Sequence, residues 1–123
     1  MINIYLDDLR GKPTPDPTGE GIWKDDTGTE WYVVRSYRSC LEALKRYNGT
    51  IDVLSLDHDL GMDPDLELGR EASGYDVLNW IEEQVVKAPG SFTVPRFRIH
   101  SANPTGRKRM LQAINAICSP RRD

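Results

Sequence analysis

The apolar run at residues 51–56 constrains the fold of this chain most strongly. It is short and rich in Ile, Val and Leu, and an Asn-Gly turn signal stands before it, which together predict a buried β-strand. Buried strands of this type are common in parallel sheets that are covered on both faces. The run leads directly into Asp57, His58 and Asp59. Open α/β sheets bind ligands just beyond the carboxyl ends of such strands, so these residues are candidates for a site.

Two further strand-like segments also end in polar residues. Residues 1–6 lead into Asp7 and Asp8, and residues 96–101 end in a histidine and a serine. Because parallel strands place their carboxyl ends at one edge of the sheet, these side chains are expected to meet those that follow residue 56. The coincidence of three such strand ends is the main evidence for a functional site.

Strand-like and helix-like segments alternate along the chain. A further strand is expected over residues 30–36. Apolar spacings of three and four residues predict helices over 37–47 and 74–87, and Asn103-Pro104 starts a last one. This order predicts an α/β fold with a mostly parallel sheet of about four strands and flanking helices.

The remaining features of the sequence set its class. Residues 11–29 are rich in Pro and Gly, which interrupt helix and strand alike, so an irregular insertion is expected there. A length of 123 residues predicts a single domain over residues 1–123. No apolar stretch approaches the roughly 20 residues that span a membrane. A net charge of −3 gives no basic field for extended duplex DNA.

The N-terminus and the two cysteines predict a cytoplasmic protein. Asp7 and Asp8 interrupt the only apolar run near the N-terminus, so no signal-peptide pattern is present. Cys40 and Cys118 are far apart and lack metal-ligand spacing. Free buried thiols, which suit a reducing compartment, are expected.

The aspartates at the strand ends are candidate metal ligands. Asp7, Asp8, Asp57 and Asp59 would lie together if the strands at 1–6 and 51–56 are neighbours. Carboxylates at that distance repel one another unless a cation neutralises them. Ligand sets made of oxygen atoms favour Mg²⁺ or Mn²⁺. The alternative is that these aspartates cap helices or lie in solvated loops.

Histidines and hydrogen-bond donors complete the candidate site. His58 and His100 are the two histidines of the chain, and imidazole exchanges protons near neutral pH, as general acid–base work on a phosphoester requires. A structural role for either histidine is the alternative. The residues expected to bind phosphate are Arg10, Ser101, Asn103 and Arg107.

These motifs resemble the receiver domain of response regulators. Asp7 and Asp8 match its acidic pair, Asp57 matches its phosphoacceptor, and Ser101-Ala102 resembles its Thr/Ser-Ala pair. The chain departs from that pattern because the insertion replaces the first helix and the chain is expected to end before any fifth strand. The lysine of phosphoryl signalling therefore has no counterpart. The resemblance implies a receiver-like, flavodoxin-like fold.

A narrower family fits better. The segments Leu-Asp-Asp-Leu-Arg (6–10), Leu-Asp-His-Asp-Leu-Gly (56–61) and Ile-His-Ser-Ala-Asn-Pro-Thr-Gly-Arg (99–107) together resemble the cyclic-phosphate processing receiver domain family. Members of that family are predicted to act on terminal cyclic phosphates in nucleic-acid repair. The resemblance implies a substrate that is a phosphate-containing nucleotide or an RNA end.

Three functions follow as expectations. The first is a metal-dependent phosphoesterase that acts on 2′,3′-cyclic phosphates, with carboxylates as metal ligands and the two histidines as acid and base in an unassigned order. Asp57 would be a metal ligand or, as its receiver position implies, a nucleophile. The second is a non-catalytic receiver-like binding or regulatory module. The third is a nuclease of the Toprim type, which usually needs a glutamate where Asp7 and Asp8 stand.

Overall fold

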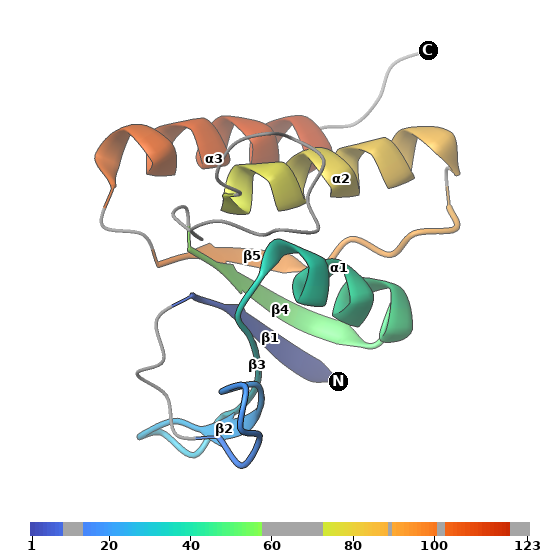
Figure 1. Ribbon diagram of the computed structural model, residues 1–123. Helices are drawn as coiled ribbons and strands as arrows, with labels where there is room; N and C mark the ends of the chain where they lie inside the picture. Colours follow the sequence, from blue (N-terminus) through green and yellow to red (C-terminus); the bar gives the residue numbers. More distant parts are fainter. Residues whose placement is uncertain (9–13, 58–72, 89, 101–102, 119–123) are drawn as a thin grey trace.

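The computed structural model describes residues 1–8, 14–57, 73–88, 90–100 and 103–118 (Figure 1). Within these residues the chain forms five strands and three helices, and none of these helices is long and apolar enough to cross a membrane. In chain order the elements are β1 (Ile2–Leu6), β2 (Gly21–Lys24), β3 (Glu30–Val34), α1 (Tyr37–Arg46), β4 (Ile51–Leu56), α2 (Gly74–Lys87), β5 (Arg96–Ile99) and α3 (Pro104–Cys118).

The strands form one sheet in the order β2-β3-β1-β4-β5. β1 pairs in parallel with both β3 and β4, and β4 pairs in parallel with β5. The first strand of the chain therefore lies in the middle of the sheet, and four strands end at one edge. This arrangement confirms the predicted α/β fold with a mostly parallel sheet and flanking helices.

The sheet has one strand more than the sequence predicted. β2 lies inside the segment expected to be irregular, and it pairs antiparallel with β3 so that Trp23 lies opposite Trp31. The glycines in this segment were interpreted as a sign of irregular structure, but one of them lies in the turn of the hairpin. Gly28 has a φ of 85°, a left-handed conformation that glycine adopts without strain.

The Asp25 carboxylate holds the turn of this hairpin. It accepts hydrogen bonds from the backbone N–H groups of Thr27 and Thr29 at 2.9 and 3.0 Å. Its second oxygen accepts from the Trp31 indole N–H at 2.9 Å. The Thr27 hydroxyl also donates to this carboxylate. Together these hydrogen bonds, with the one from the Thr27 hydroxyl having the largest effect, lower the pKa of Asp25 to about 2.

The hairpin is expected to loosen in acid as Asp25 takes up a proton. Because the pKa of Asp25 lies at about 2 instead of its ordinary 3.8, the stabilisation is complete above pH 3.8 and is lost as the pH falls through 2. An NMR titration that follows the Trp31 indole N–H resonance should give a midpoint near pH 2. A midpoint near 3.8 would show that these hydrogen bonds do not hold the carboxylate.

All three helices pack on one face of the sheet (Figure 1). The apolar strands had instead favoured a sheet that is covered on both faces. A smaller cluster of Tyr5, Trp31 and Val33 lies on the other face, with Trp23 packed against it. The fully buried side chains of the main core are Ile4, Leu6, Val34, Cys40, Leu44, Leu54, Leu56, Val77, Leu78, Ile81 and Met110. The hairpin, instead of a helix, supplies the aromatic packing of the second face.

The two cysteines lie in different environments. Both are free, as predicted. Cys40 lies in the main core, where burial raises the pKa of its thiol. The prediction that Cys118 is also buried is wrong, because it ends α3 on the solvent side.

Candidate functional site

Three candidate residues form a row at the carboxyl edge of the sheet, and we call Asp7, Asp57 and His100 the site row. Each directly follows the last residue of a strand, β1, β4 or β5. Their backbone N–H groups still donate to carbonyls of the neighbouring strands at 3.0 to 3.1 Å. The sheet therefore fixes the backbone of all three.

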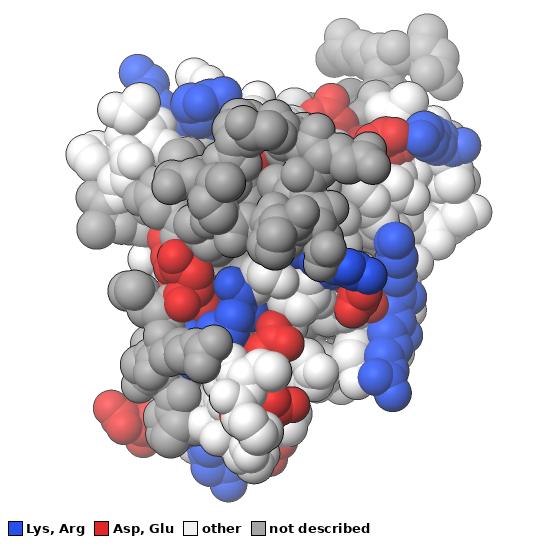
Figure 2. All heavy atoms as spheres, in the orientation of Figure 1, with Lys and Arg blue, Asp and Glu red and all other residues white. Residues whose placement is uncertain are grey.

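The side chains of the site row converge. One ligand atom from each lies within 4.8 Å of the others. His100 Nε2 is 3.5 Å from Asp7 Oδ2, and Asp7 is only 8% exposed. Figure 2 shows acidic side chains next to basic ones on the left, in the region where β1 and β4 end in Figure 1. Two oxygen donors and one nitrogen donor at this separation fit a single divalent cation, whose bonds to such atoms are about 2.0–2.6 Å long.

The imidazole of His100 is held on two further sides. Its Nδ1 lies 2.7 Å from the Ser55 hydroxyl oxygen, and its ring stacks on Tyr5 with centroids 4.1 Å apart. Ser55 is fully buried on β4, and its small side chain leaves room for the two rings to meet. Because a hydroxyl donates or accepts, Ser55 can hold either tautomer and leave Nε2 facing Asp7.

Arg35 adds a positive charge beside the site row. It directly follows β3, and its guanidinium donates to the backbone carbonyl of Asp7 at 3.2 Å and to that of Gly19 at 3.0 Å. The Glu20 carboxylate accepts from the Arg35 backbone N–H at 2.8 Å. Arg35 therefore ties the start of the β2 segment to β1. Sequence reasoning missed it, although it holds the position after β3 that Asp7 holds after β1.

The start of α2 packs against the backbone of Asp57. Gly74 is buried, and a Cβ atom there would overlap the Asp57 carbonyl oxygen and lie 2.7 Å from Met110 Cε. The Asp76 carboxylate accepts from the Ser73 backbone N–H at 2.8 Å, and an acidic residue suits the first turn of a helix. The glycine and the cap together bring α2 against the strand end that carries Asp57.

Asp8 does not belong to the group that contains the site row, although the sequence placed it among the metal ligands. The third member of the group is instead the imidazole nitrogen of His100. The ligand set expected from the sequence contained only aspartate oxygens. Four predicted site residues lie outside the described part of the chain: Arg10, His58, Asp59 and Ser101.

Two predicted phosphate-binding residues lie near the end of β5. The Asn103 side-chain carbonyl accepts from the Gly106 backbone N–H at 3.0 Å, so it caps α3. Arg107 is exposed, and its guanidinium donates to the carbonyl of Ile99 at 3.2 Å. Ile99 directly precedes His100. The structure therefore places the Arg107 charge beside the site row.

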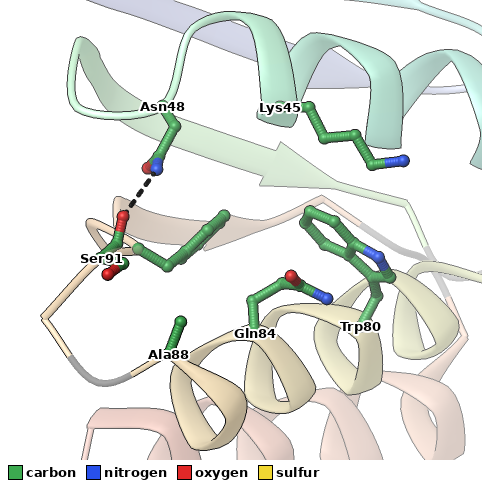
Figure 3. A pocket seen from close by; sticks show the side chains of 7 residues that line it. Lys45, Asn48, Trp80, Gln84, Ala88 and Ser91 are labelled. Atoms are coloured by element: carbon green, nitrogen blue, oxygen red, sulfur yellow. Dashed lines mark hydrogen bonds between the residues drawn. The ribbon is translucent and has the colours of Figure 1, made fainter.

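A cavity of about 370 Å³ lies at the opposite edge of the sheet (Figure 3). It opens between the ends of α1 and α2, where Lys45 faces Trp80 and Gln84. Asn48 donates across it to the carbonyl of Ser91 at 3.2 Å. The described residues of its lining include no carboxylate and no imidazole, so they supply none of the chemistry of the site row.

The parallel sheet with acidic and imidazole side chains at its carboxyl edge defines an α/β protein of the receiver type. The chain belongs to the cyclic-phosphate processing receiver domain family, whose model matches residues 2–116. This match confirms the resemblance that the three sequence motifs carried. No curated protein and no solved structure matched the sequence.

Proposed function

We propose that this protein hydrolyses a cyclic phosphate, on a nucleotide or at the end of an RNA, with the help of a divalent cation. The convergence of Asp7, Asp57 and His100 within 4.8 Å carries the proposal. The family description, which names the processing of cyclic phosphates, supports this choice of substrate. The reaction adds water across one phosphorus–oxygen bond of the ring and leaves a phosphomonoester.

His100 is the proposed proton-transfer group. Ring opening removes a proton from the attacking water and delivers one to the departing ribose oxygen, while a new phosphorus–oxygen bond replaces the one that breaks. His100 Nε2 faces Asp7, whose carboxylate would stabilise the charged imidazole 3.5 Å away. The Ser55 hydroxyl holds the ring through Nδ1, so Nε2 is the nitrogen that we propose exchanges the proton.

Asp7 and Asp57 are the proposed ligands of Mg²⁺ or Mn²⁺. Both ions prefer carboxylate oxygens, and these two carboxylates come from neighbouring strands whose backbones are fixed. When bound, the cation would offset the negative charge on the phosphoryl oxygens. Arg107, in the first turn of α3 and bonded to the last carbonyl of β5, is proposed to contact the same phosphate.

Incubation with defined cyclic phosphates tests the proposal. The protein is mixed with Mg²⁺ or Mn²⁺ and either an RNA that ends in a 2′,3′-cyclic phosphate or a free 2′,3′-cyclic nucleotide. Chromatography should detect a ring-opened monophosphate, and EDTA should stop its formation. If neither substrate is consumed with either metal, the hydrolase proposal is wrong. Binding of a cyclic nucleotide without turnover would instead favour a receiver-like binding module.

A further inference from the structure

A second cavity lies on the sheet face that the main helical core does not occupy, and we call it the aromatic pocket. Its volume is about 260 Å³, slightly below the roughly 300–1,000 Å³ of sites for drug-sized ligands. It therefore suits one ring system better than a whole nucleotide. The residues of its lining that matter here are Tyr5, Trp23, Trp31, Arg98, Asp25 and Asp26.

The aromatic pocket presents surfaces that suit a flat ring. Trp23 and Trp31 meet Tyr5 edge-on, at interplanar angles of 65° and 79°. The Arg98 guanidinium carbon lies 5.6 Å from the centre of the Trp31 ring. Proteins bind nucleobases by stacking them on aromatic rings and on planar guanidinium groups.

The aromatic pocket adjoins the site row through Tyr5. The Tyr5 ring lines the pocket and also stacks on His100, at 4.1 Å with an interplanar angle of 12°. Tyr5 precedes Asp7 by two residues, and Arg98 precedes His100 by two. Residues two apart in a strand point to the same face about 6.6 Å apart. If one end of a molecule is bound at the site row, the part of that molecule next to the bound end would therefore lie at the aromatic pocket.

The charges of the aromatic pocket select against a second phosphate. Asp25 and Asp26 line it, and both oxygens of Asp25 accept hydrogen bonds within the hairpin. Asp26 is exposed at the rim. Carboxylates repel a phosphate but accept hydrogen bonds from the N–H groups at the edge of a base. The pocket thus suits a neutral ring that carries N–H donors.

We infer that the aromatic pocket binds the base of the nucleotide whose cyclic phosphate lies at the site row, an inference that rests on the proposed function. The half-buried Trp23 provides the stacking surface, the buried Trp31 forms part of the wall, and Arg98 and Asp26 contact the edge of the ring. The preferred substrate is therefore a nucleotide or an RNA terminus, and a cyclic phosphate without a base is a poor substrate.

Tryptophan fluorescence tests the inference. The chain has three tryptophans, and Trp80 lies in the other cavity, so a Trp80→Phe protein reports from Trp23 and Trp31. 2′,3′-Cyclic UMP should quench this emission in a saturable way, and ribose 5-phosphate should not. Trp23→Leu, made in the same background, should weaken binding of 2′,3′-cyclic UMP by roughly 5- to 150-fold. Arg98→Gln, a change at an exposed position, should also weaken binding of 2′,3′-cyclic UMP. This second variant keeps the test valid if Trp23→Leu disrupts the hairpin.

Two outcomes would overturn the inference. One is that ribose 5-phosphate quenches as strongly as 2′,3′-cyclic UMP, and the other is that both variants bind 2′,3′-cyclic UMP as tightly as the parent. A substrate comparison separates this inference from the proposed function. If methyl ribofuranoside 2,3-cyclic phosphate is hydrolysed with the same kcat/KM as 2′,3′-cyclic UMP, the base pocket is wrong and the hydrolase stands. If 2′,3′-cyclic UMP quenches but is never hydrolysed, the pocket stands and the hydrolase is wrong.

Discussion

Replacement of His100 by alanine is expected to lower kcat for cyclic-phosphate hydrolysis by about 10²- to 10⁴-fold, the usual contribution of a positioned acid or base. The side chain is 11% exposed and lies between Tyr5 and Asp7, so water is a poor substitute for it. Added imidazole should restore part of the activity of His100→Ala, because it supplies the missing proton-transfer group. An unchanged kcat would remove His100 from the mechanism.

Ser55→Ala is the matched control for this loss. It keeps the imidazole and removes only the hydroxyl that lies 2.7 Å from Nδ1, so a smaller loss of about 10- to 100-fold is expected. Affinity for Mn²⁺, measured by electron paramagnetic resonance, separates the two roles open to His100. If the carboxylates alone hold the cation, His100→Ala keeps its Mn²⁺ affinity. A loss of affinity as large as the loss in kcat would make His100 a metal ligand instead.

Replacement of Gly74 by alanine is expected to destabilise the fold and disable the site together. The added Cβ would overlap the Asp57 carbonyl oxygen and press on Met110 Cε. Such overpacking costs about 1–3 kcal/mol or more. Alanine improves helix propensity over glycine by at most about 1 kcal/mol, so the clash decides the sign. Urea unfolding should show the lost stability, and the folded fraction should have reduced turnover because Asp57 is displaced.

Gly49→Ala separates displacement of the site from a general loss of stability. Gly49 has a φ of 89°, and a Cβ there would meet nothing within 4 Å. The left-handed conformation alone costs an alanine about 1–2 kcal/mol. Gly49 stands before β4, at the edge opposite the site row. This variant should therefore lose similar stability and keep its turnover, whereas equal turnover in both variants would show that Gly74 does not position Asp57.

Strong local patterns made much of the fold predictable. The helix predicted over residues 74–87 has those bounds, because its apolar spacing and its Ser73–Asp76 cap both mark its start. The strand over 51–56 also has its predicted bounds, since its apolar run is brief and flanked by turn and polar residues. β1 and β4 are neighbours, which is the condition on which the sequence placed Asp7 and Asp57 at one edge.

The parts that sequence reasoning missed depend on contacts between distant residues. β2 forms because Trp23 pairs with Trp31 across a turn, and a segment rich in Pro and Gly gives no apolar run to mark it. Ser55 looked like an ordinary strand residue, and its contact with His100 joins positions 45 residues apart. Which aspartate joins the imidazole depends on how each side chain is directed at the strand end. A list of strand-end residues could not choose between Asp7 and Asp8 for that reason.

Phosphorus NMR of a 2′,3′-cyclic nucleotide, incubated with Mg²⁺ and the wild-type or Asp57→Asn protein, tests the proposed hydrolysis at the site row most directly. Asp52→Asn is the matched control, because Asp52 lies near the other end of β4 and pairs there with Arg96 at 2.9 Å. The cyclic phosphate signal should convert to a monophosphate signal with the wild type and with Asp52→Asn, and persist with Asp57→Asn. Conversion at the wild-type rate by Asp57→Asn, or no conversion by any of the three proteins, would contradict the proposed role of the site row.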